Sequence, residues 1–199
     1  MFTYLALGDS YTIGEQILIA ESFPYQTVQM LRKKGLDITA PEILAKTGWT
    51  TDELLTAISE TKLLNKYDFV SLLIGVNNQY RGKDIEKYKT EFQILLNKSI
   101  SFAGNDAAHV FVLSIPDWGV TPFAKGKNIK LISAEIDAFN EACRIISEKS
   151  GCHFIDNIAL QEKKNTPEML AGDGLHPSGK AYSKWSEKLA AFIFAAHSL

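Results

Sequence analysis

Short apolar runs alternate along the chain with longer segments in which apolar residues recur every three or four positions. Five of the short runs have the length and composition of β-strands, namely residues 4–7, 38–45, 69–74, 110–113 and 153–155. Pro41 interrupts the second run and predicts a strand at the sheet edge, because proline cannot donate a ladder hydrogen bond. The unbroken apolar run 69–74 predicts a strand that is buried on both faces.

Helical periodicity fills the intervals between these runs. Residues 23–34 predict a helix with Ser22 as its N-cap and Pro24 in its first turn. Thr50 and Glu53 have the spacing of a capping box, which predicts a helix that runs to about Glu60. Three apolar stripes predict further helices: Tyr88, Phe92, Leu95 and Leu96; Ile132, Ile136, Phe139, Cys143 and Ile146; and Tyr182, Trp185, Leu189, Phe192 and Ile193.

The regular alternation of strand and helix is typical of an α/β fold, with a parallel sheet that is covered by helices on both faces. The chain has 199 residues, contains no repeat and shows no linker-like segment. We therefore expect residues 1–199 to form a single domain. A domain of this size buries roughly 70% of the surface that the unfolded chain exposes, so it needs no metal or disulfide to fold.

Composition and charge narrow the class of protein. Hydrophobic residues make up 46% of the chain and charged residues 22%, as in ordinary globular proteins. The formal net charge of -2 gives no sign of a nucleic-acid or membrane-surface partner. No apolar run approaches the ~18 residues of a transmembrane helix, and the first residues lack the basic region of a signal peptide. The prediction is a cytoplasmic protein, and its oligomeric state stays open.

Cysteine and histidine residues give no sign of a metal site or a disulfide. Cys143 falls on a helical stripe and Cys152 at the start of a strand, so both are expected to be buried free thiols. His109, His153 and His197 have no partner motif and are expected to be structural or surface residues. No pair of histidines has metal-ligand spacing with a carboxylate, so the sequence predicts no metal and no cofactor.

Polar residues that could do chemistry follow the predicted strands. In parallel sheets, ligands bind outside the carboxyl ends of the strands. The first strand runs into Gly8-Asp9-Ser10, and a serine hydroxyl there is a nucleophile once a base adjoins it. Asp173 and His176 are three residues apart and can reach one side of a single turn. His176 is then a candidate base that Asp173 orients, which is the arrangement that acyl transfer needs.

Acyl transfer also needs hydrogen-bond donors for the negative charge that develops on the carbonyl oxygen. The backbone N–H groups of Ser10 and Gly48 and the side-chain amide of Asn77 are the candidates. Each follows a different predicted strand. The three donors meet over one crevice if the first strand lies between the second and the third.

Gly8-Asp9-Ser10, Gly48, Gly75-x-Asn77 and Asp173-x-x-His176 resemble, in this order, the four sequence blocks of the SGNH/GDSL hydrolases, a family of esterases, lipases and acylhydrolases. The resemblance covers nearly the whole chain. It implies a flavodoxin-like, three-layer α/β/α sandwich with a five-stranded parallel sheet in the order 2-1-3-4-5.

The same resemblance assigns roles to particular residues. It implies Ser10 as nucleophile, His176 as base and Asp173 as the partner of the base. It also implies an oxyanion hole formed by the Ser10 N–H, Gly48 and Asn77. The third block is often Gly-x-Asn-Asp, whereas this chain has Asn78 in the last position, and we expect a modest effect on rate.

Residues 115–123, which follow the fourth predicted strand, are the candidate wall of a substrate pocket. The prolines and aromatic residues of this segment suggest a semi-rigid apolar wall, so Trp118 and Phe123 are expected to line an acyl or alcohol pocket. Replacing Trp118 with alanine should then change chain-length preference more than stability. Arg81 could meet an anionic leaving group, although a solvated surface position is favoured. The expected substrate is a small-molecule ester with a short to medium acyl chain.

Alternative functions use the same sheet edge. A carbohydrate O-acetylesterase or a transacylase would share the nucleophile, and a non-catalytic module could hold a nucleotide or a flavin. Gly174, Gly179 and Lys180 are spaced as in a phosphate-binding loop, but Ala181 stands where that loop requires serine or threonine. A Gly-x-Ser-x-Gly elbow is absent, which argues against the larger α/β-hydrolase fold.

Overall fold

The fold is built on a parallel sheet of five strands. The computed structural model describes residues 1–157 and 167–197. In these residues the strand order is β2-β1-β3-β4-β5, as the family resemblance implied. The strands are β1 (Tyr4–Gly8), β2 (Glu42–Ala45), β3 (Phe69–Leu73), β4 (Val110–Leu113) and β5 (His153–Ile155). Because β1 lies between β2 and β3, the condition for bringing the three donor segments together is met.

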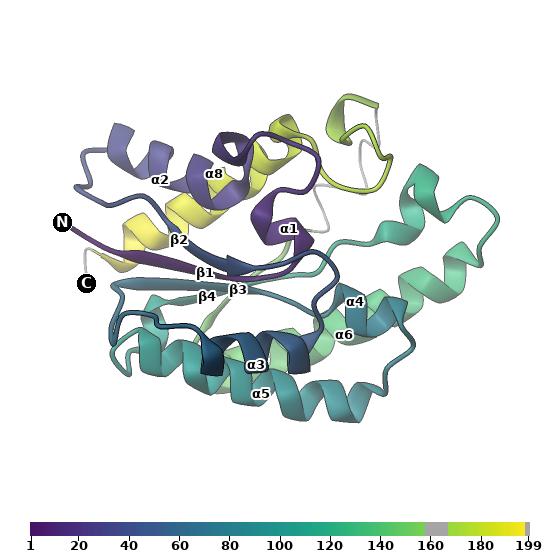
Figure 1. The fold of residues 1–199 in the computed structure, drawn as a ribbon, viewed down its shortest axis with the longest axis horizontal. Helices are drawn as coiled ribbons and strands as arrows, with labels where there is room; N and C mark the ends of the chain where they lie inside the picture. The colour runs from purple at the N-terminus through teal and green to yellow at the C-terminus, as the bar shows by residue number, and fades with distance from the viewer. Residues whose placement is uncertain (158–166, 198–199) are drawn as a thin grey trace.

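Helices cover both faces of the sheet and make three layers (Figure 1). One face carries α2 (Phe23–Lys33) and α8 (Gly179–Ala196), which pack against each other. The other carries α3 (Thr51–Glu60), α5 (Ile85–Phe102) and α6 (Ile129–Lys149). The remaining elements are short: α1 (Ser10–Ile13), α4 (Val76–Tyr80) and the 3₁₀ turns η1 (Ile19–Glu21), η2 (Ala107–His109), η3 (Trp118–Val120), η4 (Pro122–Ala124) and η5 (Pro167–Met169).

The core lies between the sheet and these helices. Every residue of β1 and β3 is buried, as expected for central strands of a parallel sheet. The predicted stripes on α5 and α6 face the sheet, except that Ile146 is only partly buried. The stripe that predicted α8 is also buried, except for Phe192. Its side chain is 38% exposed and meets the His153 ring edge-on, because it projects from the margin of that stripe.

Two local predictions need correction. The second strand begins at Glu42, directly after Pro41, whereas Ile38 makes only an isolated bridge to Phe2. Its position at the edge of the sheet is confirmed. Ser22 stands at the N-cap position of α2 but makes no capping bond, because its hydroxyl donates to the Ile19 carbonyl.

Other local predictions are confirmed. Glu53 accepts a hydrogen bond from the Thr50 backbone N–H, as a capping box requires. Both cysteines are buried free thiols, and burial raises the pKa of each to about 12. Among the described residues, no helix combines the length and hydropathy needed to cross a lipid bilayer.

Candidate active site

The register of the sheet brings three strand ends to the same level. Gly8, the last residue of β1, is paired with Ala45 at the end of β2 and with Leu73 at the end of β3. The segments that follow these strands therefore leave the sheet side by side. A Cβ atom on Gly8 would lie 2.1 Å from Thr12 Oγ1 and 2.5 Å from the Leu73 carbonyl oxygen, so only glycine fits here.

The sharp change from strand to helix places Ser10. Asp9 caps α1 by accepting a hydrogen bond from the Tyr11 N–H at 3.0 Å, and Ser10 is the first residue of that helix. Only 5% of the Ser10 residue is exposed. Its hydroxyl oxygen lies 3.0 Å from His176 Nε2, so the serine and the predicted base are in hydrogen-bond contact.

A short hairpin between η5 and α8 holds the other two residues. Leu170 and Pro177 form an antiparallel bridge, and the Ala171 N–H donates to the His176 carbonyl. Within the turn, Asp173 Oδ1 accepts hydrogen bonds from the N–H groups of Leu175 and His176. Its other oxygen, Oδ2, lies 2.6 Å from His176 Nδ1. The carboxylate thus fixes both the backbone turn and the orientation of the imidazole ring.

Charge and burial at this triad favour an ionised Asp173. Partial burial raises the pKa of this carboxyl, but the hydrogen bonds from His176 and from the two backbone N–H groups outweigh that effect and hold the pKa below its usual value. Tyr11 packs against the imidazole, with ring centroids 5.0 Å apart. His176 itself is 7% exposed, so its ring is screened from bulk water on most sides.

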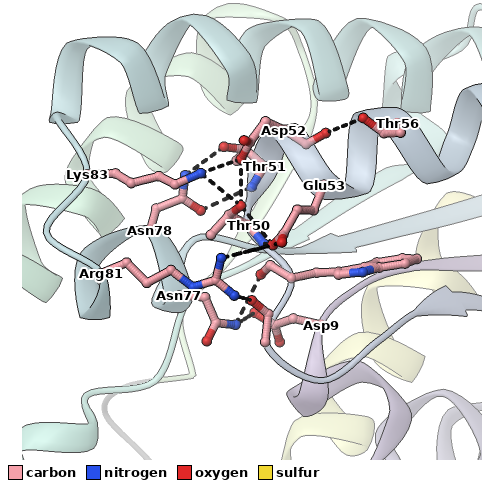
Figure 2. A network of polar contacts seen from close by, with 12 residues as sticks. Asp9, Thr50, Thr51, Asp52, Glu53, Thr56, Asn77, Asn78, Arg81 and Lys83 are labelled. Atoms are coloured by element: carbon pink, nitrogen blue, oxygen red, sulfur yellow. Dashed lines mark hydrogen bonds and ion pairs between the residues drawn. The ribbon is translucent and has the colours of Figure 1, made fainter.

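Gly48 lies across the cleft from the triad, on the segment that leaves β2. It adopts a φ of +84°, which favours glycine, and lines the same cleft as Ser10 and Asn77. Its carbonyl accepts a hydrogen bond of 2.5 Å from the guanidinium of Arg81, which also pairs with Glu53 (Figure 2). Arg81 is exposed, as expected, with 43% of its side chain accessible, and the two contacts also hold the arginine against the Gly48 segment.

Asn77, in α4, faces the same cleft. Its side-chain nitrogen donates to the Trp49 carbonyl at 3.0 Å and to Asp9 Oδ2 at 3.3 Å (Figure 2). Asp9 is fully buried, and burial raises the pKa of its carboxyl to about 7. The carboxyl next to the serine thus contacts the amide that was predicted to bind the oxyanion.

Asn78 occupies the position at which the chain departs from the family pattern. It is fully buried, and its Oδ1 accepts a hydrogen bond from the Thr51 N–H while its Nδ2 donates to Thr51 Oγ1. The Thr51 hydroxyl in turn donates to a carboxylate oxygen of Glu91. The Asn78 amide therefore bonds both the backbone N–H and the hydroxyl oxygen of Thr51, and it connects α4 to the start of α3.

Aromatic and aliphatic side chains complete a cleft of about 180 Å³ beside Ser10. Trp118 is buried and donates a hydrogen bond of 2.7 Å to Gln79 Oε1, whereas Phe123 is 42% exposed. The Phe123 N–H donates to the Gly174 carbonyl and so joins this wall to the triad hairpin. The residues that line the cleft are Ser10, Tyr11, Thr47, Gly48, Val76, Asn77, Tyr80, Trp118, Phe123, Leu175 and His176.

Asp9, Tyr80 and Arg81 are the residues of this region that sequence reasoning missed or undervalued. Asp9 gave no separate signal because it adjoins the serine. Tyr80 and Arg81 lie one helical turn beyond Val76 and Asn77, a spacing that would have pointed to the cleft had α4 been predicted as a helix.

The residues that resemble a phosphate-binding loop do not form one. Gly174 belongs to the triad hairpin and Gly179 begins α8. The Lys180 ammonium pairs with Glu168 at 2.9 Å. Within residues 1–157 and 167–197, no group of three or more histidine, cysteine or carboxylate side chains could hold a metal ion.

Known proteins share both the sequence pattern and the fold. The model of the GDSL-like Lipase/Acylhydrolase family matches residues 6–184. The chain is similar to the spore germination lipase LipC of Bacillus licheniformis, with 27% identity covering 94% of each chain. It is also similar to an arylesterase of Vibrio mimicus, with 25% identity over 97% of this chain and 88% of that one.

A solved structure gives the same picture of the fold. The lipase/acylhydrolase of Enterococcus faecalis superimposes with a TM-score of 0.78 at 19% identity, covering 98% of this chain and 96% of that chain. The five strands and the helices on both faces are therefore shared over almost the full length.

Proposed function

The chain belongs to the GDSL-like lipase/acylhydrolase family and is a carboxylic ester hydrolase, and we propose that it cleaves small esters through an acyl-enzyme on Ser10. The observation that carries the proposal is the unbroken line of contacts from Ser10 Oγ to His176 Nε2, at 3.0 Å, and from His176 Nδ1 to Asp173 Oδ2, at 2.6 Å.

The first half of the proposed reaction forms the acyl-enzyme. Ser10 Oγ attacks the ester carbonyl carbon while His176 Nε2 takes the hydroxyl proton, and Asp173 stabilises the imidazolium that results. The negative charge on the carbonyl oxygen is received by the N–H groups of Ser10 and Gly48 and by the amide of Asn77. When the tetrahedral intermediate collapses, the C–O bond to the alcohol breaks and His176 returns the proton to the departing alkoxide.

The second half consumes water. A water molecule gives its proton to His176 and attacks the acyl carbon, and the same donors receive the oxyanion. Collapse breaks the bond to Ser10 Oγ, which recovers its proton from His176, and the carboxylic acid leaves. All proton transfers take place among this chain, the ester and water.

The size and lining of the cleft support a short acyl chain. Its volume of about 180 Å³ lies below the ~300–1,000 Å³ of most small-molecule pockets. Val76, Trp118 and Leu175 give it apolar walls. We propose that the acyl group enters this cleft while the alcohol part stays nearer the surface.

The test is hydrolysis of p-nitrophenyl esters of increasing acyl length by the wild type and by the Ser10→Ala variant. We expect highest kcat/KM for the shortest chains and a loss of at least about 10³-fold with Ser10→Ala. Ser59→Ala, an exposed serine on α3, is the matched control and should keep wild-type activity. Turnover that survives Ser10→Ala would overturn the assignment of the nucleophile.

A covalent label gives a second, independent readout. A p-nitrophenyl alkylphosphonate should transfer its phosphonyl group to Ser10 Oγ with release of one p-nitrophenolate, because the product mimics the tetrahedral intermediate. Peptide mass spectrometry should find the adduct on the peptide that contains Ser10. An adduct on another serine, or none in folded protein, would contradict the proposal.

The small cleft also favours a second candidate within the same chemistry. An acetyl group fits it, so O-acetylated carbohydrates are candidate substrates. Release of acetate from acetylated sugars should then proceed with kcat/KM at least equal to that for p-nitrophenyl acetate. A much lower value, with retained activity on simple alkyl esters, would exclude carbohydrate esters as the preferred class.

A further inference from the structure

Exposed apolar side chains gather on the segment between η3 and the first turn of α6. We call residues 120–131 the 120–131 surface. Of the twelve large apolar residues that are exposed in the described part of the chain, four belong to it, with exposed fractions of 36 to 53%. They are Val120, Phe123, Ile129 and Leu131. In a protein of this size such residues are normally scattered singly, so their grouping indicates a contact surface.

The same segment carries a local excess of positive charge. Lys125, Lys127 and Lys130 are all exposed, and no aspartate or glutamate occurs between residues 118 and 134. The carboxylates that flank this interval are engaged: Asp117 accepts from the Ser133 hydroxyl, and Glu135 accepts from the Gln79 amide. The formal net charge of the whole chain is -2, and a sum over all residues does not show a local group of lysines.

The 120–131 surface adjoins the mouth of the catalytic cleft. Lys127 Nζ lies 5.8 Å from the ring centroids of both Tyr80 and Trp118, which line the cleft. The Phe123 backbone is bonded to the triad hairpin at Gly174. In Figure 1 this segment, in teal-green, forms the extremity of the molecule on the right, beyond the ends of the strands.

We propose that the 120–131 surface docks on a lipid bilayer that contains anionic headgroups. Ile129, Leu131 and Val120 enter the boundary between headgroups and acyl chains, and the lysine ammonium groups meet the phosphates. This combination fits lipid better than protein, because lysine is depleted from protein–protein interfaces. Docking would hold the cleft against the bilayer, and it does not depend on catalysis by Ser10.

Vesicle co-sedimentation tests the proposal with full-length protein in the Ser10→Ala background and with ether-linked lipids, so that hydrolysis cannot alter the vesicles. We expect binding to vesicles of phosphatidylcholine and phosphatidylglycerol, weaker binding to phosphatidylcholine alone, and loss of the difference at high salt. Lys125→Gln/Lys130→Gln should weaken binding to the anionic vesicles at least about tenfold, since each lysine near the surface contributes about fivefold. Ile129→Ser/Leu131→Ser should weaken binding to both kinds of vesicle.

The matched control lies before the amino-terminal end of β3, away from the strand ends that carry the cleft. Lys62→Gln/Leu64→Ser removes an exposed lysine and an exposed leucine before β3 and should leave vesicle binding unchanged. In the Ser10 form of the protein, the Ile129→Ser/Leu131→Ser variant should hydrolyse a water-soluble ester at the wild-type rate, because neither residue lines the cleft.

Three results would overturn the docking proposal. One is the absence of binding to anionic vesicles, and another is binding that both surface variants retain. The third is a concentration-dependent dimer, seen by sedimentation velocity, that Ile129→Ser/Leu131→Ser abolishes while vesicle binding persists. That result would assign the surface to a second copy of the chain. A thermal unfolding midpoint close to the wild-type value shows that the variants are folded.

Discussion

The side-chain amide of Asn77 donates a hydrogen bond to the buried carboxyl of Asp9, the residue that precedes the proposed nucleophile Ser10. The same amide also donates to the Trp49 carbonyl, so both of its N–H groups have protein acceptors. An oxyanion must therefore share or displace one of these bonds. The bond to Asp9, at 3.3 Å, is longer than the 3.0 Å bond to Trp49 and is the one that we expect to yield.

Replacing Asn77 with alanine tests its proposed role as a donor to the oxyanion. We expect kcat on p-nitrophenyl acetate to fall about 10²–10³-fold with little change in KM, because the contact is made mainly in the transition state. Asn97→Ala, on the exposed side of α5, is the control and should behave as wild type. A KM that rises while kcat holds would instead identify Asn77 as a substrate-binding residue.

The buried carboxyl of Asp9 makes stability depend on pH. Its pKa is about 7 in the folded protein, above the ordinary value of 3.8, because burial disfavours the charged form. The native state therefore keeps a proton that the unfolded chain loses, so this residue contributes less stability as pH rises from about 4 to about 7. Urea unfolding across this range should show that the free energy of unfolding of wild type falls relative to that of Asp9→Asn as pH increases. A difference that is constant with pH would show that Asp9 has no raised pKa.

Asn78→Asp restores the more common family pattern and should nevertheless destabilise this chain. The Thr51 hydroxyl has one proton, which it gives to Glu91, so an aspartate oxygen facing it would find no donor. We expect a loss of about 1–3 kcal/mol in the free energy of unfolding. The rate on small esters should change little, because Asn78 does not line the cleft.

A second substitution tests the reason for that loss. With Glu91→Gln, the new amide can donate to the Thr51 oxygen and free the hydroxyl proton for the aspartate. The double variant Asn78→Asp/Glu91→Gln should therefore be more stable than the sum of the single effects predicts, by about 0.5–3 kcal/mol. Simple additivity in urea unfolding would argue against the shared proton.

Trp118 and Phe123 both line the cleft, but we expect replacement of Phe123 to change substrate preference and replacement of Trp118 to change stability. Phe123→Ala removes a partly exposed ring and should shift the preference among p-nitrophenyl esters toward longer chains with little change in Tm. Trp118→Ala should cost about 3–5 kcal/mol, because the indole is buried and bonded to Gln79. This replaces the expectation that Trp118 affects preference more than stability. An unchanged chain-length profile for Phe123→Ala would remove that residue from the acyl site.

Strong local patterns explain what could be predicted from the sequence. Strand ends were visible because apolar runs stop abruptly at Gly8 and near Gly75. The order of the strands came from the family resemblance, since periodicity carries no information about which strands pair. The helix that carries Asn77 was missed because five residues are too few to show a helical stripe.

Contacts between distant segments explain what could not be predicted. The bracing of Gly48 by Arg81 joins residues 33 positions apart, and the Asp9–Asn77 bond joins residues 68 positions apart. Residues so far apart in the sequence form no motif of fixed spacing that would predict either contact. The hairpin that holds Asp173 was also invisible, because its bridge between Leu170 and Pro177 depends on backbone hydrogen bonds rather than on residue type.

Ser10 and His176 meet across a sequence separation of 166 residues. During synthesis at ~5–20 residues per second, the proposed nucleophile therefore leaves the ribosome roughly 8–33 s before the proposed base. Throughout that interval the nascent chain holds a serine without a partner and cannot hydrolyse esters that it meets. The moment at which esterase activity appears in a translation reaction should therefore report when the last hairpin and α8 pack onto the sheet. This measurement needs no label on the protein.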